Sequence, residues 1–170
     1  LHRQAVASYI LKGMKGTSPL GHGRAAGREA AAPARLERAQ LVARPRGEVF
    51  AFFADPRNLE RITPPFLRFR ITTPGRIEMR PGALIDYRLR LYGVPVRWRT
   101  RIDSFEPERS FVDVQVRGPY RRWRHRHDFL DAAGGTEVRD VVEYETPLGP
   151  VGVLARRLFV ARSLERIFDF

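Results

Sequence analysis

The chain has 170 residues, 43% of them hydrophobic and 29% charged, a composition typical of a soluble globular domain with a buried core. It contains no cysteine, which excludes disulfides, thiolate metal sites, iron–sulfur clusters and a cysteine nucleophile. No window approaches the roughly 18 consecutive apolar residues of a membrane-spanning helix. We expect a cytoplasmic protein, a location with which the absence of cysteine is compatible.

The net charge of +12 is unevenly distributed along the chain. Residues 1–35 hold six basic side chains against one acid, Glu29, and residues 36–170 carry the remaining +7. Nearly all of the positive charge is arginine, which a GC-rich bacterial genome explains as readily as a binding role does. A basic surface allows weak, salt-sensitive contact with an anionic membrane, and we expect no specific nucleic-acid binding.

Residues 1–35 are rich in Ala, Gly, Arg and His and lack a sustained apolar period. Such a segment cannot bury enough apolar surface to offset the entropy of ordering, which predicts a disordered tail. Its basic start resembles a targeting presequence, although the apolar run Tyr9-Ile10-Leu11 is too short for a secretory signal. We favour the interpretation that this segment is an over-extension of the native start.

From Leu36 the sequence becomes regular and predicts one domain over residues 36–170. Alternation after Leu36 indicates a strand that ends at Pro45. Apolar residues at helical spacing then predict a short helix over residues 46–54. A second short helix is predicted over residues 58–62, where two prolines follow at 64 and 65.

Six further strands follow without an intervening long helix. They are predicted at residues 66–74, 83–93, 96–105, 110–118, 121–130 and 136–145. Strict alternation over so many segments indicates an antiparallel sheet with one wet and one covered face. In the 110–118 strand, the pattern assigns Val112, Val114 and Val116 to the covered face and Asp113 to the wet face.

On the wet face, arginines of the 121–130 strand are expected to lie opposite charged residues of the 136–145 strand. The two sets are Arg122, Arg124 and Arg126, and Arg139, Glu143 and Glu145. Cross-strand pairing therefore accounts for much of the charge on this face.

The last segment changes its apolar period to three or four residues between Leu148 and Phe168. This predicts one long amphipathic helix, whose apolar stripe includes Leu154 and Leu158. The stripe is expected to cover the concave face of the sheet.

The order of one strand, two short helices, six strands and a long helix is the helix-grip order. Three segments resemble the START/SRPBCC superfamily, which includes the birch pollen allergen fold and the polyketide cyclase/dehydrase and lipid-transport group. They are PRGEVFAFFADPRNLERITPP, GPYRRWRHRHDF and GGTEVRDVVEYETPLGPVG. The resemblance implies an α+β fold, with a curved antiparallel sheet of about seven strands around the C-terminal helix and a hollow for hydrophobic or amphipathic ligands. It does not fix the function, because this fold serves binding, transport and several chemistries.

The covered face carries two histidines and an aspartate among aromatic side chains. A dry core would not tolerate these groups without partners, whereas an apolar cavity with a few convergent polar groups is typical of a ligand site. The candidate ligand-binding residues are Tyr87, Leu89, Trp98, Thr100, Trp123, His125, His127, Phe129, Asp140, Val142, Tyr144, Leu154 and Leu158. In the alternative interpretation, His125 and Asp140 hydrogen-bond each other across adjacent strands and only fix the register.

His125 and His127 are two residues apart on a strand, so both imidazoles could bind one metal ion, with Asp140 as a third ligand. A lone His-x-His is common by chance, and the superfamily that the chain resembles usually has no metal here. We therefore predict neither a metal nor another cofactor.

The predicted function is binding or carriage of a hydrophobic or amphipathic small molecule, such as a lipid, a quinone or a polyketide-like compound. The alternative is a cofactor-free polyketide cyclase or dehydratase, in which His125 or His127 acts as general base and Tyr144 donates to an enolate oxygen. No nucleophile–base pair or phosphate loop in the sequence marks a catalytic site, so binding is favoured. The sequence leaves the oligomeric state open.

Overall fold

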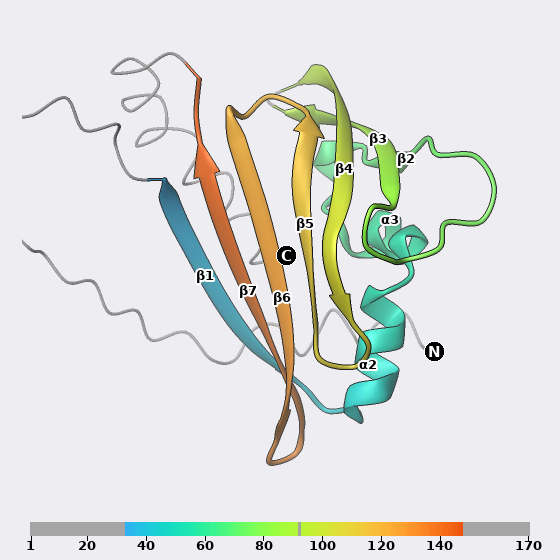
Figure 1. The fold of residues 1–170 in the computed structure, drawn as a ribbon, viewed down its shortest axis with the longest axis vertical. Coiled ribbons are helices and arrows are strands. Elements are labelled where there is room, and N and C mark those ends of the chain that lie inside the picture. The colour runs from blue at the N-terminus through green and yellow to red at the C-terminus, as the bar shows by residue number, and fades with distance from the viewer. Residues whose placement is uncertain (1–32, 92, 148–170) are drawn as a thin grey trace, which may run out of the picture.

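A computed structural model describes residues 33–91 and 93–147 of the chain. Within these residues, seven antiparallel strands form one curved sheet in the order β1-β7-β6-β5-β4-β3-β2 (Figure 1). The strands are β1 (Ala34–Val42), β2 (Arg70–Ile71), β3 (Leu84–Leu91), β4 (Val94–Glu106), β5 (Ser110–Arg117), β6 (Arg122–Ala132) and β7 (Gly135–Glu145). Neighbouring strands are consecutive in the chain except β1, which pairs with β7 along its whole length.

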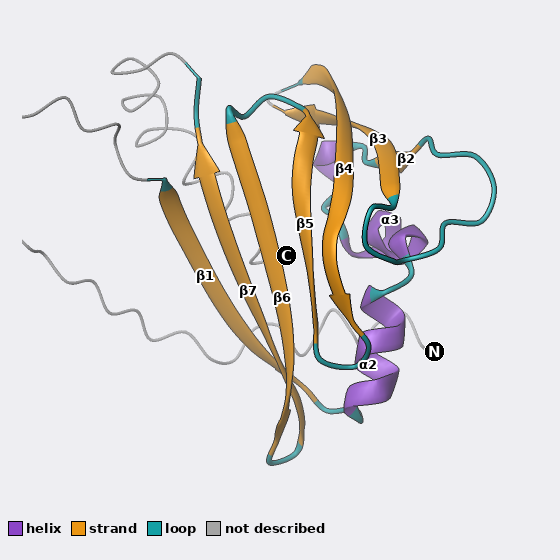
Figure 2. Cartoon of the chain, in the orientation of Figure 1, coloured by secondary structure: helices purple, strands orange, loops and turns teal. Residues whose placement is uncertain are grey.

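Short helices fill the connection between β1 and β2 (Figure 2). They are α2 (Arg46–Phe53), the 3-10 turn η1 (Pro56–Asn58), α3 (Leu59–Ile62) and the 3-10 turn η2 (Pro65–Leu67). The side chain of Asp55 caps η1 by accepting a 3.0 Å hydrogen bond from the backbone N–H of Arg57. No helix within the described residues is long and apolar enough to cross a membrane.

The predicted strands and short helices are confirmed, with two corrections at their ends. Strand β1 begins at Ala34, inside the predicted tail, because Ala34 and Arg35 pair with Tyr144 and Glu143 of β7. The strand predicted at 66–74 shrinks to the two residues of β2, because η2 occupies its start and Arg68 is left-handed with φ 46°.

The predicted long helix over 148–168, with Leu154 and Leu158, lies outside the described residues. The predicted tail also lies outside them up to residue 32.

The hydrophobic core forms where α2 packs against the end of the sheet. Val49 and Phe50 of α2 pack against Phe111 of β5, Phe129 of β6 and Val138 of β7. All five are at most 6% exposed, and burying each large apolar side chain contributes about 1.5–3 kcal/mol. This contact places α2 on the same face of the sheet as the polar residues described below.

The tight turn between β6 and β7 requires glycine. Gly134 and Gly135 have φ of 89° and 150°, and Ala132 pairs with Gly135 across the turn. A Cβ atom at Gly135 would collide with the carbonyl oxygen of Val42, so the end of β1 passes directly against this backbone.

Cross-strand charge pairing is confirmed for two of the three arginines on the outer, convex face of β6. Arg122 lies opposite Glu145 and Arg124 opposite Glu143, with nitrogen–oxygen distances of 4.0 and 3.9 Å. The third, Arg126, lies opposite Val141 and instead forms a 2.7 Å ion pair with Asp128 of its own strand.

Candidate functional site

A polar cluster occupies the concave face of the sheet, formed by neighbouring strands β4 to β7. It consists of His125 and His127 of β6, Asp113 of β5, Asp140 of β7 and Thr100 of β4. In the strand register His125 lies opposite Asp113, and His127 lies opposite Asp140. Because residues i and i+2 share a face, the two imidazole rings lie side by side with centroids 3.8 Å apart.

Each imidazole of the polar cluster lies between two carboxylates. On the β7 side, Asp140 Oδ1 lies 3.2 Å from His125 Nε2 and 2.7 Å from His127 Nδ1. The first contact is a hydrogen bond, whereas the second is close but poorly aligned for one. On the β5 side, Asp113 Oδ2 lies 3.6 Å from both His125 Nδ1 and His127 Nε2. Thr100 Oγ1 is 3.0 Å from the other Asp113 oxygen and 3.0 Å from a backbone carbonyl, so it shares its hydrogen between them.

The protonation of the polar cluster follows from this arrangement. Burial would lower the pKa of His127, but the carboxylates of Asp113 and Asp140 outweigh burial and raise this pKa to about 9. Burial would also raise the pKa of Asp140, but the two imidazoles hold it well below its usual range. The pKa of Asp113 is lowered against burial in the same way. The cluster therefore favours positive charge held between two carboxylates.

An aromatic row runs from β2 across the sheet beside the polar cluster. We define it as Phe69, Tyr87, Trp98 and Trp123, whose successive ring centroids are 4.8, 5.8 and 5.3 Å apart. Tyr120 packs against both tryptophans at 5.7 and 4.9 Å. Burial raises the pKa of Tyr87 well above its usual value, with a smaller contribution from the charge of Asp113, so its hydroxyl stays protonated.

The indole N–H of Trp98 is buried and has no hydrogen-bond partner within the described part of the chain. An unpaired buried donor costs about 1–3 kcal/mol, so this group is available to an acceptor atom of a ligand.

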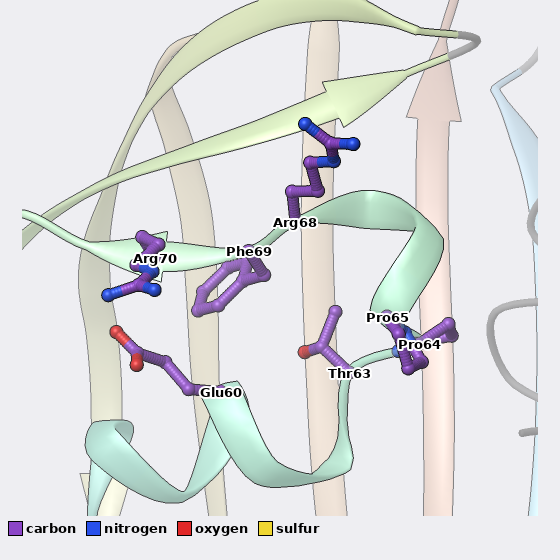
Figure 3. A pocket seen from close by; sticks show the side chains of 7 residues that line it. All are labelled: Glu60, Thr63, Pro64, Pro65, Arg68, Phe69 and Arg70. Atoms are coloured by element: carbon purple, nitrogen blue, oxygen red, sulfur yellow. The ribbon is translucent and has the colours of Figure 1, made fainter.

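A hollow of about 540 Å³ opens at the β2 end of the aromatic row (Figure 3). Its walls are Glu60, Thr63, Pro64, Pro65, Arg68, Phe69 and Arg70, contributed by α3, η2 and the start of β2. The volume lies in the range of small-molecule sites. None of the predicted ligand-binding residues in the described part of the chain lines this hollow, but Phe69 connects it to Tyr87 and so to the rest of the aromatic row.

The structure gathers most of the predicted site residues into two groups. Thr100, His125, His127 and Asp140 meet in the polar cluster, and Tyr87, Trp98, Trp123 and Tyr144 lie along or against the aromatic row. Leu89 packs with Trp98, and Val142 packs with Tyr144. Phe129 lies apart from both groups, in the core beneath α2.

Asp113 was missed because the prediction for β5 assigned the wrong face. In β5, Val112 faces outward and Asp113 faces His125. The prediction had placed the valines on the covered face and Asp113 on the wet face. Phe111 and Val112 are 5% and 1% exposed, so both faces of the strand are covered and an apolar period of two gives no unique side. The sequence signal that could have indicated the inner face of β5 was Phe111. It lies opposite Phe105 across the turn and shares a face with Asp113.

Comparison with known proteins places this arrangement in a family. A family model described as polyketide cyclase / dehydrase and lipid transport matches residues 42–169, which contain the whole polar cluster and aromatic row. The chain belongs to this family. Two Mycobacterium tuberculosis proteins, MT0096 and Rv0088, are each 28% identical over 115 residues. The match covers 67% of this chain and 49% of each relative, so the chain spans about half their length.

Solved structures share the fold of this family member at low sequence identity. TTHA0849 from Thermus thermophilus has a TM-score of 0.65 at 17% identity, covering 80% of this chain and 90% of that one. A START superfamily protein from Mycobacterium smegmatis has a TM-score of 0.58 at 12% identity, covering 77% and 89%. Ara h 8.0201 has a TM-score of 0.55 at 16% identity, covering 80% and 93%. The predicted superfamily and helix-grip fold are confirmed.

Proposed function

We propose that this member of the polyketide cyclase/dehydrase and lipid-transport family binds or carries a hydrophobic or amphipathic small molecule of lipid, quinone or polyketide type. The observation that carries the proposal is the buried N–H of Trp98 in the middle of the aromatic row, which has no hydrogen-bond partner among the residues that the structure describes. If the aromatic row had only a structural role, we would expect this N–H to be hydrogen-bonded within the protein or exposed to solvent. A ligand that lies along the row with an acceptor oxygen at Trp98 removes the cost of leaving it unpaired.

The hollow at the β2 end supports an amphipathic ligand. Phe69 continues the apolar wall into it, while Arg68 and Arg70 at its walls outnumber the single acid Glu60. The ligand would therefore lie with its apolar body on the aromatic row and an oxygen-bearing or anionic end toward the hollow.

The variant Trp98→Phe tests this placement, because it removes the N–H and keeps an aromatic ring. With anilinonaphthalene sulfonate as a fluorescent probe, we expect about 2–10-fold weaker binding, the loss of one hydrogen bond. Trp123→Phe is the matched control in the same row and should change the dissociation constant less than twofold, because the Trp123 N–H is not an unpaired buried donor. Equal losses in both variants, or no loss in Trp98→Phe, would contradict the proposed contact.

The cyclase or dehydratase alternative receives less support from the geometry. All four imidazole nitrogens of His125 and His127 lie within 3.6 Å of a carboxylate, so none is directed only toward a substrate. Tyr144, the third catalytic candidate, packs against Tyr120 and Trp123 instead.

A second candidate function, docking on an anionic membrane, is favoured by an arginine strip on the convex face. We define the strip as Arg88 of β3 and Arg97 of β4, which lie directly opposite each other in register. Within the described residues neither of the two has an ion-pair partner. Like charges in direct register are destabilising, so an external anionic surface is the natural counter-charge.

The double variant Arg88→Gln/Arg97→Gln should weaken binding to phosphatidylserine-containing vesicles about 30-fold at low salt, at roughly 1 kcal/mol for each arginine near an anionic surface. Arg122→Gln/Arg124→Gln removes the same charge from the paired half of the face and should cost less than threefold. Vesicle flotation over a salt series measures both. Docking on the arginine strip is wrong if the two double variants behave alike or if salt has no effect.

A further inference from the structure

We propose that Asp113, His125 and His127 form a binding site for a divalent cation of the zinc type. These three residues offer ligand atoms that all lie within 4.8 Å of one another. The site goes beyond the proposed binding of an organic molecule, and it does not depend on it.

The spacing of the three ligand atoms fits a metal better than it fits hydrogen bonds. Asp113 Oδ2 is 3.6 Å from His125 Nδ1 and 3.6 Å from His127 Nε2, and both distances exceed those of hydrogen bonds. Ligands about 2.0–2.1 Å from a tetrahedral zinc ion lie about 3.3 Å apart. The two distances from Asp113 therefore lie within a few tenths of an ångström of this spacing, and the two histidine nitrogens lie within 4.8 Å of each other.

The atoms that would not bind the ion are held by neighbouring groups. His125 Nε2 and His127 Nδ1, the opposite ring nitrogens, both face Asp140 Oδ1 at 3.2 and 2.7 Å. Asp113 Oδ1, the other carboxylate oxygen, accepts from Thr100 Oγ1 at 3.0 Å. Carboxylates behind ligating histidines orient the rings and increase their basicity in metal sites. Asp140 and Thr100 are therefore positioning residues, while Asp113 takes the ligand position that the sequence suggested for Asp140.

Charge and ligand number point to the same kind of ion. The four ionisable side chains of the polar cluster are each at most 15% exposed, and two of them are carboxylates. A divalent cation neutralises both carboxylates without adding a proton to either imidazole. Two nitrogens and one oxygen give three protein ligands, which leaves a fourth tetrahedral position for water or for an oxygen of a bound molecule.

A register-fixing role alone predicts a different outcome from the same cluster. Hydrogen bonds between His125 and Asp140 would fix the strands without any affinity for metal. If the cluster has only this role, replacing Asp113 would not change the amount of metal that the protein binds. Metal titration therefore separates the two roles.

The experiment uses the full chain without an affinity tag, stripped with a chelator and dialysed. Zn²⁺ is titrated by calorimetry, and Co²⁺ is titrated by its visible absorption. We expect one equivalent of Zn²⁺ at micromolar concentration and the intense Co²⁺ bands of a four-coordinate site. Long-range proton–nitrogen NMR should show His125 bound through Nδ1 and His127 through Nε2. No stoichiometric binding, or binding through other nitrogens, would overturn the proposal, and this test needs no variant to fold.

Variants then locate the site. Asp113→Ala and His125→Ala should each weaken Zn²⁺ binding at least 100-fold, because each removes a ligand. Thr100→Val keeps all three ligands and should weaken binding about 10–100-fold through the position of Asp113. Asp128→Ala, an acid on β6 that pairs with Arg126, is the control and should leave the affinity unchanged. Binding that survives Asp113→Ala and His125→Ala would place the metal elsewhere and refute the site.

Discussion

Replacing Phe129 with alanine is expected to lower the free energy of unfolding by about 3–5 kcal/mol, the largest effect of any single change considered for this fold. Phe129 is 1% exposed, and its ring centroid lies 5.2 Å from Phe50, 5.5 Å from Phe53 and 6.0 Å from Phe111. Truncation would leave a cavity where α2 meets the sheet. Urea unfolding followed by circular dichroism measures the loss.

The neighbouring variant Leu130→Ala is the control for Phe129→Ala. Leu130 follows on the same strand, faces the opposite side of the sheet and is 38% exposed, so it should cost about 1 kcal/mol or less. Similar losses from the two variants would show that α2 does not seal the core as described. Because Phe53 also contacts the His127 ring at 6.4 Å between centroids, Phe129→Ala should loosen the support of the polar cluster as well.

Replacing Asp140 with asparagine is expected to lower the free energy of unfolding of metal-free protein by about 3 kcal/mol near pH 6, because a buried ion pair loses one partner. Asparagine keeps the shape of the side chain and removes its charge beside His125 and His127. Asp131→Asn, at an exposed pair with Arg46, is the control and should cost less than about 1 kcal/mol. Denaturation in chelator at fixed pH measures both variants.

The cost of Asp140→Asn should shrink as the pH rises. Asp113, His125 and Asp140 face His127, and its pKa is raised from 6.5 to about 9 on folding. The resulting stability is fully present below pH 6.5 and is lost as the pH rises toward 9, because the folded state then gives up its extra proton. The gap between wild type and Asp140→Asn should therefore narrow over this window. A gap that is constant or widens would contradict a charged His127.

The sequence was sufficient to predict the described sheet because most of its strands have only one covered face. On β3, β6 and β7, charged residues occupy most of the alternate positions on the outer face, and the residues predicted to face inward do so, from Ile85 to Tyr144. The two short helices were equally predictable, from the helical spacing of apolar residues and from the prolines that follow the helices. These are local patterns, and local patterns persist in the folded state.

The polar cluster was only half predictable, because its members come from strands whose relative register no local pattern specifies. His125 and His127 share a face by their spacing alone, and Asp140 shares the covered face of β7. Whether Asp113 faces the two histidines depends on the orientation of β5. Adjacent residues Phe111 and Val112 are both buried there, so the sequence does not indicate which face is the inner one. A register shift in β4 between Ile102 and Ser104 further breaks the alternation that could have aligned the two strands.

The pairing of β1 with β7 has a consequence for how the chain reaches this structure. The only strand that β1 pairs with in the described sheet is β7, the last described strand in the chain, and Thr136 donates a 2.8 Å hydrogen bond to the carbonyl of Arg44 across 92 positions. Contacts of such sequence separation slow folding, because a long loop must close before they form. During synthesis on the ribosome, β1 must therefore wait unpaired until residue 145 has emerged, and until then β6 has no neighbour on its β7 side. Until then, the edges of both β1 and β6 lack their β7 partner. This is the interval in which the growing chain is most exposed to aggregation and in which we expect a chaperone to bind it.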